Sequence, residues 1–286
     1  MPNPTEIKNK DQFVIAYLPD FEKEEIVLSH AIFLSKMIDK GLILLHICDK
    51  HYSKLSTDQA EERLKEIQQK ISSQVSATYA AIPGKTKTII NALPTLIGAV
   101  AIVGAIDPHA SIGKPTNKRT FLNLFHECKI AYLTVQKPLE DSSVYQQVCT
   151  TIDFKKESKE KLIWTSYFAR FNKSQINVMY YDYKDEGLHT KWYNNMRFLH
   201  KFFNNLNLTF TPHIIPSNHS TFTDINALKE IEQQQMPCGV MLCVTTWEKD
   251  AIEWFYGTQE QRTIVNKLGI PVMFLNPRDD LYVLCD

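Results

Sequence analysis

Short apolar runs rich in β-branched residues alternate with longer amphipathic stretches along the chain. Residues 13–18 (FVIAYL) and 42–47 (LILLHI) are expected to form strands, and residues 23–40 between them have apolar side chains at helical spacing. This alternation is typical of a parallel sheet whose consecutive strands are joined by helices. The remaining elements of the first half are expected in the same order: strands over 75–82, 100–105 and 130–135, and helices over 56–72, 86–97 and 117–128.

The same pattern starts again in the second half. Strands are expected over 148–152, 176–181, 208–214, 239–244 and 270–275, and helices over 158–171, 188–206, 223–234 and 258–267. Individual residues repeat as well, because Asp20-Phe21 and Asp49 recur at one constant interval as Asp153-Phe154 and Asp182. We interpret the two halves as an internal repeat, and we call the alignment that places Asp20 on Asp153 the repeat register.

The repeat register predicts which helix faces are buried. Three apolar positions of helix 23–40 fall on three aromatic positions of helix 158–171: Ala31, Leu34 and Ile38 on Trp164, Tyr167 and Phe171. We therefore expect the apolar residues of the second helix to face the core: Ile163, Trp164, Tyr167 and Phe171.

The chain length and one polar stretch indicate two domains. At ~150 residues per domain, 286 residues correspond to about two. Residues 138–143 (PLEDSS) are rich in turn-forming residues and separate the halves. The expected domains are residues 1–140 and 141–286.

Charge argues against nucleic acid as a partner. Lysine plus arginine and aspartate plus glutamate both number 32, so the formal net charge is zero. A protein that binds phosphates through lysine and arginine would carry a net positive charge or a basic stripe. Neither is present in this sequence.

One uncharged segment, residues 88–106, is nominally long enough to cross a bilayer. It contains Pro94 and Gly98, and its apolar pattern changes from helical spacing over 89–97 to a β-branched run over 100–103. We expect a helix followed by a buried strand, and no membrane span.

The cysteines and the N-terminal residues favour a cytoplasmic protein. The six cysteines are scattered without a Cys-x-x-Cys pair, which is typical of a reduced protein and not of a disulfide scaffold or a zinc site. Residues 1–10 carry three charged side chains and no apolar run, so no signal peptide is expected.

Three groups of residues are similar to the sequence features of a known protein family. A strand followed by Asp-Phe occurs at 148–154 (VCTTIDF), and the second strand ends in Leu44-Leu45-His46-Ile47. The last helix and strand run from Gly257-Thr258 to Pro271-Val272. With these features the sequence resembles a tandem universal stress protein, that is, two universal stress protein domains in one chain.

The resemblance implies an α/β fold with two Rossmann-like, doubly wound domains. Each would hold a five-stranded parallel sheet of order 3-2-1-4-5 with helices on both faces. Ligands of such sheets bind where the strand order reverses, here between the first and fourth strands of each half. The chain leaves these strands at Asp20 and Gly104 in the first half and at Asp153 and Val244 in the second.

In nucleotide-binding members of the family, the first-strand aspartate contacts adenine. A Gly-x2-Gly-x9-Gly-Ser/Thr loop after the fourth strand holds the phosphates, because glycines let backbone N–H groups approach phosphate oxygens. The resemblance therefore implies six candidate residues for binding ATP or AMP: Asp20, Gly104, Gly113, Asp153, Gly257 and Thr258.

Neither half keeps the family's loop. In the second half, Val244 and Trp247 stand where the first two glycines belong, and only Gly257-Thr258 matches. The acidic residues Glu248, Asp250 and Glu253 would repel a triphosphate. The first-half loop lacks the spacing too, with Asp107 in place of a glycine, although most of its other polar residues suit an anion: Ser111, Lys114, Thr116, Lys118 and Arg119.

Each candidate also has a purely structural interpretation. Thr258 with Gln261 fits a capping box that opens the last helix. Asp20 and Asp153 would equally cap or neighbour the first helix of each half. Trp247 and Trp254 would fill the former nucleotide site or present an apolar surface.

Three possible metal ligands lie close together in sequence: His46, Asp49 and His51. It lacks the helical i, i+4 spacing of a metal site, so we interpret it as a solvated loop.

The function expected from the sequence is that of a non-enzymatic stress-response protein. It would act through protein interaction or response to a small ligand, with its two domains paired as a pseudo-dimer and a homodimer as a further form of association. No catalytic residues and no metal site are expected, because no nucleophile–base pair is present. The alternative is a sensor that binds ATP or AMP, with slow ATP hydrolysis.

Overall fold

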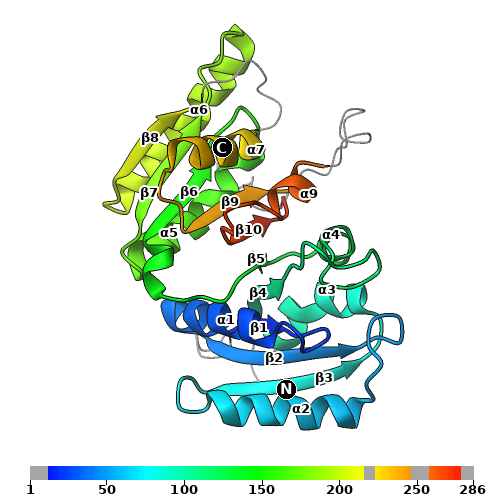
Figure 1. Cartoon of the computed structure of the whole chain (residues 1–286). Coiled ribbons are helices and arrows are strands. Elements are labelled where there is room, and N and C mark those ends of the chain that lie inside the picture. The colour runs from blue at the N-terminus through cyan, green and yellow to red at the C-terminus, as the bar shows by residue number, and fades with distance from the viewer. Residues whose placement is uncertain (1–11, 216–222, 246–257, 278–286) are drawn as a thin grey trace, which may run out of the picture. The chain divides into compact units, whose positions relative to one another are not determined.

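The structure is a computed structural model, and it describes residues 12–215, 223–245 and 258–277. The chain divides into two compact units, Met1–Leu139 and Glu140–Asp286, which are described one at a time (Figure 1). Each unit alternates strands with helices, and every strand pairing within a unit is parallel. The expected α/β class with a parallel sheet is therefore confirmed, whereas two separate five-stranded domains remain a prediction.

In the first unit the strands are ordered β3-β2-β1-β4-β5. Its elements are β1 (Phe13–Tyr17), α1 (Glu24–Ile38), β2 (Gly41–Cys48), α2 (Thr57–Ile71), β3 (Ala77–Pro83), α3 (Thr86–Ile97), β4 (Ala99–Ala105), α4 (Lys118–Phe125) and β5 (Ala131–Val135). The central strands β1 and β4 are almost entirely buried, because helices cover both faces of the sheet.

In the second unit the strands are ordered β8-β7-β6-β9-β10. Its elements are η1 (Ser142–Gln146), β6 (Gln147–Thr151), η2 (Lys156–Glu160), α5 (Lys161–Phe171), β7 (Gln175–Tyr180), α6 (Glu186–Asn205), β8 (Phe210–Ile214), α7 (Thr223–Gln234), β9 (Val240–Val244), α9 (Gln259–Thr263) and β10 (Val272–Leu275). The expected helix over 258–267 is thus shorter than its apolar pattern suggested.

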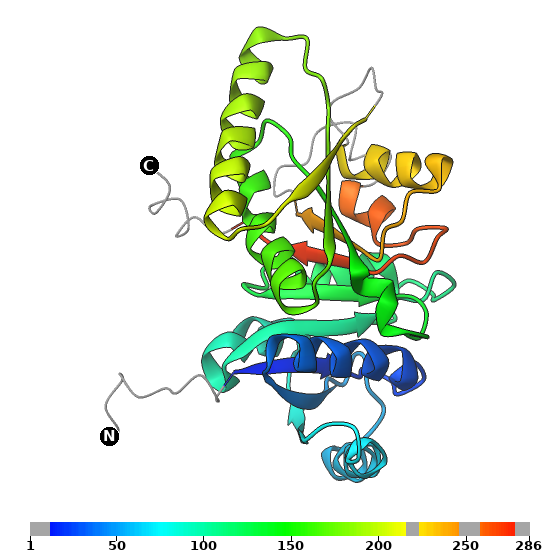
Figure 2. The same cartoon turned by 90° about the vertical axis from the view of Figure 1, so that its left-hand side faces the viewer.

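The helices form two layers in each unit. In each unit, the right-handed crossovers place the helices that lead toward one edge strand on one face of the sheet. The helices that lead back toward the other edge strand lie on the opposite face. In agreement, α3 packs against α4, and in the second unit α5 packs against α6 and α7 against α9. Figure 2 shows α1 (dark blue) lying along the sheet of the first unit.

Two local expectations are confirmed. The uncharged segment 88–106 forms most of α3 and all of β4, and Gly98 between them has a left-handed conformation (φ 62°) that ends the helix. Ser56 and Gln59 form the capping box at the start of α2. Within the described part of the chain, no helix combines the length and apolar character needed to span a membrane.

The expected inner face of α5 is partly wrong. Trp164 is buried, but Ile163 and Phe171 are 38% and 50% exposed. The face that points inward carries Lys161 and Thr165 instead, both almost completely buried. Apolar spacing could not reveal this, because it assumes that a lysine faces solvent, and Lys161 is bonded inside the unit.

Candidate functional site

The strand order reverses between β1 and β4 in the first unit and between β6 and β9 in the second. We call the residues at these two carboxyl ends the first edge (Asp20, Lys23, Gly104, Asp107 and the loop 106–117) and the second edge (Thr151, Asp153, Lys161, Asp224 and Gln259). Ligands of open α/β sheets bind at such points, so each edge is a candidate site.

At the first edge, Asp20 is half-buried just beyond β1, and its Oδ1 accepts a hydrogen bond from the Glu22 amide at 3.2 Å. Burial raises the pKa of its carboxyl, with a further upward effect from Glu22, against opposing effects that include the charges of Lys114 and Lys23. Asp20 therefore organises the turn into α1, in agreement with its structural interpretation.

Two of the charges at this edge, those of Lys23 and Asp107, are paired with each other. Lys23 Nζ lies 3.4 Å from Asp107 Oδ2. Asp107 also accepts a hydrogen bond from the His109 amide at 2.9 Å, and this bond, together with Lys23, lowers the pKa of the carboxyl. A ligand phosphate would have to compete with Asp107 for Lys23.

The two glycine candidates of the first edge have different roles. A Cβ on Gly104 would lie 2.6 Å from Cε2 of Phe121, so this glycine lets α4 approach β4 closely. Gly113 is exposed with φ +97°, nothing lies within 4 Å of a Cβ built there, and its amide donates to Thr120 Oγ1 at 3.0 Å. Gly113 is therefore required by the loop conformation, because few other residues adopt this φ.

The start of α4, where a phosphate would bind, has its own cap. The Asn117 side chain accepts hydrogen bonds from the Arg119 and Thr120 amides, and its Nδ2 donates to the Ala110 carbonyl at 2.7 Å. These bonds satisfy helix N–H groups that would otherwise be available to an anion. Lys114, Lys118 and Arg119 nevertheless stay exposed around this helix start.

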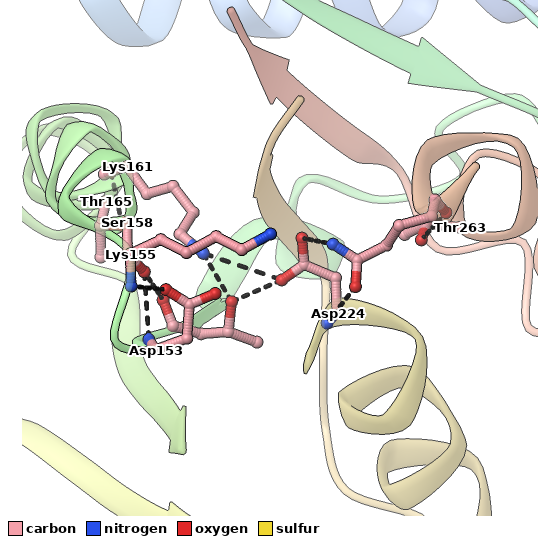
Figure 3. A network of polar contacts seen from close by, with 9 residues as sticks. Asp153, Lys155, Ser158, Lys161, Thr165, Asp224 and Thr263 are labelled. Carbon is pink, nitrogen blue, oxygen red and sulfur yellow. Dashed lines mark hydrogen bonds and ion pairs between the residues drawn. The ribbon is translucent and has the colours of Figure 1, made fainter. Parts of the chain in front are cut away.

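The second edge is a buried polar network that joins the two helical layers (Figure 3). Lys161 Nζ, from α5, donates to Thr151 Oγ1 at 2.5 Å and lies 3.7 Å from Asp224 Oδ1, from α7. Thr151 in turn donates to Asp224 Oδ1 at 2.5 Å. Lys161 and Asp224 side chains are only 3% and 5% exposed, so the pair is desolvated.

Gln259 of α9 completes this arrangement. Its Oε1 accepts from the Asp224 amide at 3.2 Å, and its Nε2 donates to Asp224 Oδ2 at 3.5 Å. We call Thr151, Lys161, Asp224 and Gln259 the Lys161–Asp224 network. Burying an ion pair costs several kcal/mol per ion unless further hydrogen bonds satisfy both groups, which Thr151 and Gln259 do here.

Asp153 lies beside this network (Figure 3). Its amide donates to Ser158 Oγ at 3.2 Å and its Oδ1 accepts from the Lys155 amide at 2.9 Å. Burial raises the pKa of its carboxyl, opposed mainly by the charge of Lys161. Like Asp20, Asp153 organises the backbone that leads into the first helix of its unit.

Thr258 caps α9, since its side chain accepts from the Gln261 amide at 3.4 Å. The structure therefore shows the Thr258 cap, which is one half of the expected capping box. Gly257, Trp247 and Trp254 lie outside the described residues.

The fold of the whole chain matches solved structures. A universal stress protein from Archaeoglobus fulgidus DSM 4304 has a TM-score of 0.68 and 14% identity, and the match covers 95% of this chain and 98% of that chain. A protein of Pseudomonas aeruginosa UCBPP-PA14, assigned to the universal stress proteins, has a TM-score of 0.61 and 14% identity, with 96% of each chain covered. The chain has the universal stress protein fold.

The same fold occurs in the cytoplasmic domain of a prokaryotic cation chloride cotransporter, with a TM-score of 0.57, 11% identity and 93% of this chain and 95% of that chain covered. No protein-family model matches the sequence, and no curated protein matches it. The universal stress protein fold is therefore shared by proteins described in different ways, and residues must decide between functions.

Four residues of the second edge were absent from the sequence candidates: Thr151, Lys161, Asp224 and Gln259. One signal was available for Lys161, because the repeat register aligns it with Leu28, which is buried in α1. A lysine at a core position of the universal stress protein fold predicts a buried partner. The partner itself could not be identified, because Asp224 is distant in sequence.

The expectation that His46, Asp49 and His51 form a solvated loop is wrong for His46, which is a buried residue of β2. His46 is completely buried, with Nδ1 2.7 Å from the Leu18 carbonyl and Nε2 2.8 Å from Ser53 Oγ. Asp49 accepts hydrogen bonds from the Thr86 amide at 2.8 Å and the His51 amide at 3.0 Å. Across the residues that the structure describes, no group of His, Cys, Asp and Glu could hold a metal ion.

Proposed function

We propose that this chain is a tandem universal stress protein that acts without catalysis, in the cytoplasm, through protein interaction or response to a small ligand. Its domains would be residues 1–140 and 141–286, each with a five-stranded sheet of order 3-2-1-4-5. The matching element order of the two units supports this, as do the ends of α1 and α5, Ile38 and Phe171, which the repeat register aligns. The 95% coverage in the comparison with the Archaeoglobus protein supports it further.

The proposal that the second domain works without a bound nucleotide rests on one observation, the Lys161–Asp224 network. Among the described residues, Lys161 is the only cation of the second edge that is buried beside Asp153. It is bonded to Thr151 and paired with Asp224. An incoming phosphate would have to take Lys161 from Asp224 and leave that carboxylate buried without a counter-ion, which is strongly unfavourable. We therefore propose that the second domain does not bind ATP.

We also propose that the first domain does not bind ATP, because protein groups already occupy the positions that a phosphate would need. Asp107 neutralises Lys23, Asn117 caps α4, and Phe121 occupies the space beside Gly104. We propose that the two domains pair within the chain, since a tandem arrangement supplies each with a partner at high effective concentration. Association of two chains into a homodimer is included in this proposal.

The second candidate function is an ATP- or AMP-binding sensor with slow ATP hydrolysis. One observation favours it for the first domain: Lys114, Lys118 and Arg119 are exposed around the start of α4, and the charge of Lys114 opposes the rise in the pKa of Asp20 that burial causes. A phosphate there would bind the exposed cations and displace the Asn117 cap.

Calorimetric titration of the full chain with MgATP and with AMP tests these functions. Tryptophan emission recorded in parallel reports the second domain, because all four tryptophans lie between Trp164 and Trp254. We expect no saturable heat and no emission change below about millimolar nucleotide, a range in which specific binding contributes at least ~4 kcal/mol.

Saturable heat without an emission change would instead favour the sensor function of the first domain. That heat should then be lost in Lys114→Glu and retained in the control Lys65→Glu, which alters an exposed lysine on α2. A saturable emission change would contradict the proposal for the second domain.

A further inference from the structure

The loop of residues 106–117, which links β4 to α4, presents an apolar side chain to solvent. Ile112 is 78% exposed, more than any other large apolar residue in the described part of the chain. The same loop buries Pro115 and Thr116. The loop therefore has a buried side, and Ile112 is left outside it although an apolar side chain gains free energy by burial.

Backbone hydrogen bonds brace this loop. The Asp107 amide donates to the Thr116 carbonyl at 2.9 Å, which joins the two ends of the loop. The Lys114 amide donates to the Ser111 carbonyl at 3.1 Å, which closes a β-turn that has Ile112 as its second residue. A side chain displayed on a braced turn loses little conformational freedom when a partner covers it, so this arrangement favours binding.

The first turn of α4 lies beside this β-turn. The Gly113 amide donates to Thr120 Oγ1 at 3.0 Å, so the residue that follows Ile112 is bonded to the start of the helix. Lys118 and Arg119 belong to the same first turn of α4, and both are exposed. Ile112 and these two cations therefore occupy neighbouring surface.

The charges of Lys118 and Arg119 are not compensated nearby. Among the described residues, neither side chain forms an ion pair. Lys114 is different, because its charge opposes the rise in the pKa of Asp20 that burial causes, and Glu22 acts on the same carboxyl. Lys114 is thus partly balanced by carboxylates, whereas Lys118 and Arg119 give the surface beside Ile112 a positive charge.

Charge and polarity together indicate the kind of partner. Phosphate groups would satisfy the two cations but would leave Ile112 in water. A segment that lies on a membrane buries a broad apolar face, and Ile112 is the only exposed large apolar residue of loop 106–117. An acidic protein segment satisfies both features, because its carboxylates pair with lysine and arginine while an apolar side chain between them covers Ile112.

We propose that Ile112, Lys118 and Arg119 form a docking surface for an acidic segment of a partner protein. Carboxylates of that segment would lie beside Lys118 and Arg119, and one of its apolar side chains would pack on Ile112. We call these three residues the Ile112 surface. The inference rests on the proposed function, because it names the kind of protein with which the first domain interacts.

Fluorescence anisotropy of a labelled peptide mixed with the full chain tests this. The probe is a fluorescein-labelled peptide of Glu-Glu-Leu repeats, and its control is the same peptide with glutamine in place of glutamate. We expect saturable binding of the acidic peptide below about millimolar and none of the control peptide. Lys118→Glu combined with Arg119→Glu should weaken binding by at least about tenfold, because the two substituted side chains would repel the carboxylates.

Ile112→Ser distinguishes a docking surface from a merely basic one. It leaves every charge in place and should weaken binding of the acidic peptide by about tenfold, because it removes the apolar contact. The matched control is Leu96→Ser on α3, since Leu96 is 67% exposed, and it should leave binding unchanged. The control for the charge reversal is Lys36→Glu combined with Lys65→Glu, at two exposed lysines on α1 and α2, which should also leave binding unchanged.

The inference is overturned if Ile112→Ser binds the acidic peptide as tightly as the parent chain, or if the parent chain does not bind it below about millimolar. Binding of phosphatidylserine vesicles through Ile112 without binding of the peptide would also overturn it, because the partner would then be a membrane. A dimer of the chain that Ile112→Ser abolishes would assign the surface to a second copy instead. Nucleotide calorimetry does not depend on Ile112, so this inference and the proposed function can fail separately.

Discussion

The first and second edges occupy the same position in their units and are built from different chemistry. In the first unit, the repeat register places Leu18 and Leu28 where the second unit has Thr151 and Lys161, and both leucines are buried. The second unit keeps the polar residues buried by pairing Lys161 with Asp224. The comparison teaches that this fold accepts either an apolar or a fully bonded ionic filling at the same place.

The difference also bears on ligand binding. The cations near the first edge are exposed, Lys114 in the loop and Lys118 and Arg119 in the first turn of α4, whereas Lys161 at the second edge is desolvated and bonded. Exposed cations can accept an anion at little cost, and a buried pair must first be broken. If either edge responds to an anion, we expect it to be the first.

Removing one partner of the buried pair should produce the largest effect. Asp224→Ala leaves the Lys161 ammonium desolvated without its counter-ion and should lower the free energy of unfolding by about 3–5 kcal/mol. Urea unfolding followed by tryptophan emission measures this, because every tryptophan lies in the second half.

The matched control replaces both charged residues of the buried pair by leucine, the residue that the first unit has in place of Lys161. Lys161→Leu combined with Asp224→Leu removes both charges and should recover most of the lost stability, since Leu28 fills the equivalent place in the first unit. Equal losses in the single and double variants would show that volume, not charge pairing, determines the second edge.

A smaller effect is expected at the first edge from Gly104→Ala. The added Cβ would lie 2.6 Å from Phe121 Cε2. Overpacking of this kind costs about 1–3 kcal/mol, which differential scanning calorimetry would detect. Because the cause is steric, the additional change Phe121→Leu should restore part of the stability.

Gly113→Ala is the comparison for that substitution. Nothing would contact the new Cβ, but φ is +97°, so the cost should be backbone strain alone and should not respond to Phe121→Leu. A loss in Gly104→Ala that Phe121→Leu leaves unchanged would contradict the packing role of Gly104.

The smallest effects distinguish Asp49 from Asp182, two aspartates that the repeat register aligns. Asp49 caps α3 through the Thr86 amide, so Asp49→Ala should cost about 1 kcal/mol. Asp182 is exposed and pairs with the exposed Lys184, so Asp182→Ala should cost under ~0.5 kcal/mol. Thermal unfolding of both variants measures the difference, and equal losses would contradict it.

The pKa values at these positions follow the same contrast. Burial alone would raise the pKa of Asp49, but the hydrogen bonds from the Thr86 and His51 amides lower it overall. The pKa of Asp182 is lowered chiefly by its hydrogen bond with Lys184. The Asp49 carboxylate thus stabilises a helix, whereas the Asp182 carboxylate forms a surface pair.

The order of strands and helices could be predicted from the sequence. Alternation between strand-like and helix-like spacing is a local property, and it identified α3 followed by β4 in a segment that also fits a membrane span. Local capping was predictable for the same reason, as Ser56 with Gln59 and Thr258 with Gln261 illustrate.

The sequence by itself determined the fold class, because side-chain periodicity and turn residues act over a few neighbouring positions. Only the tertiary structure decided which face of α5 is buried and that Lys161 meets Asp224 at the end of β6. Pairing between residues on different helices depends on how the layers meet across the sheet, and a charged residue carries no local sign of its distant partner.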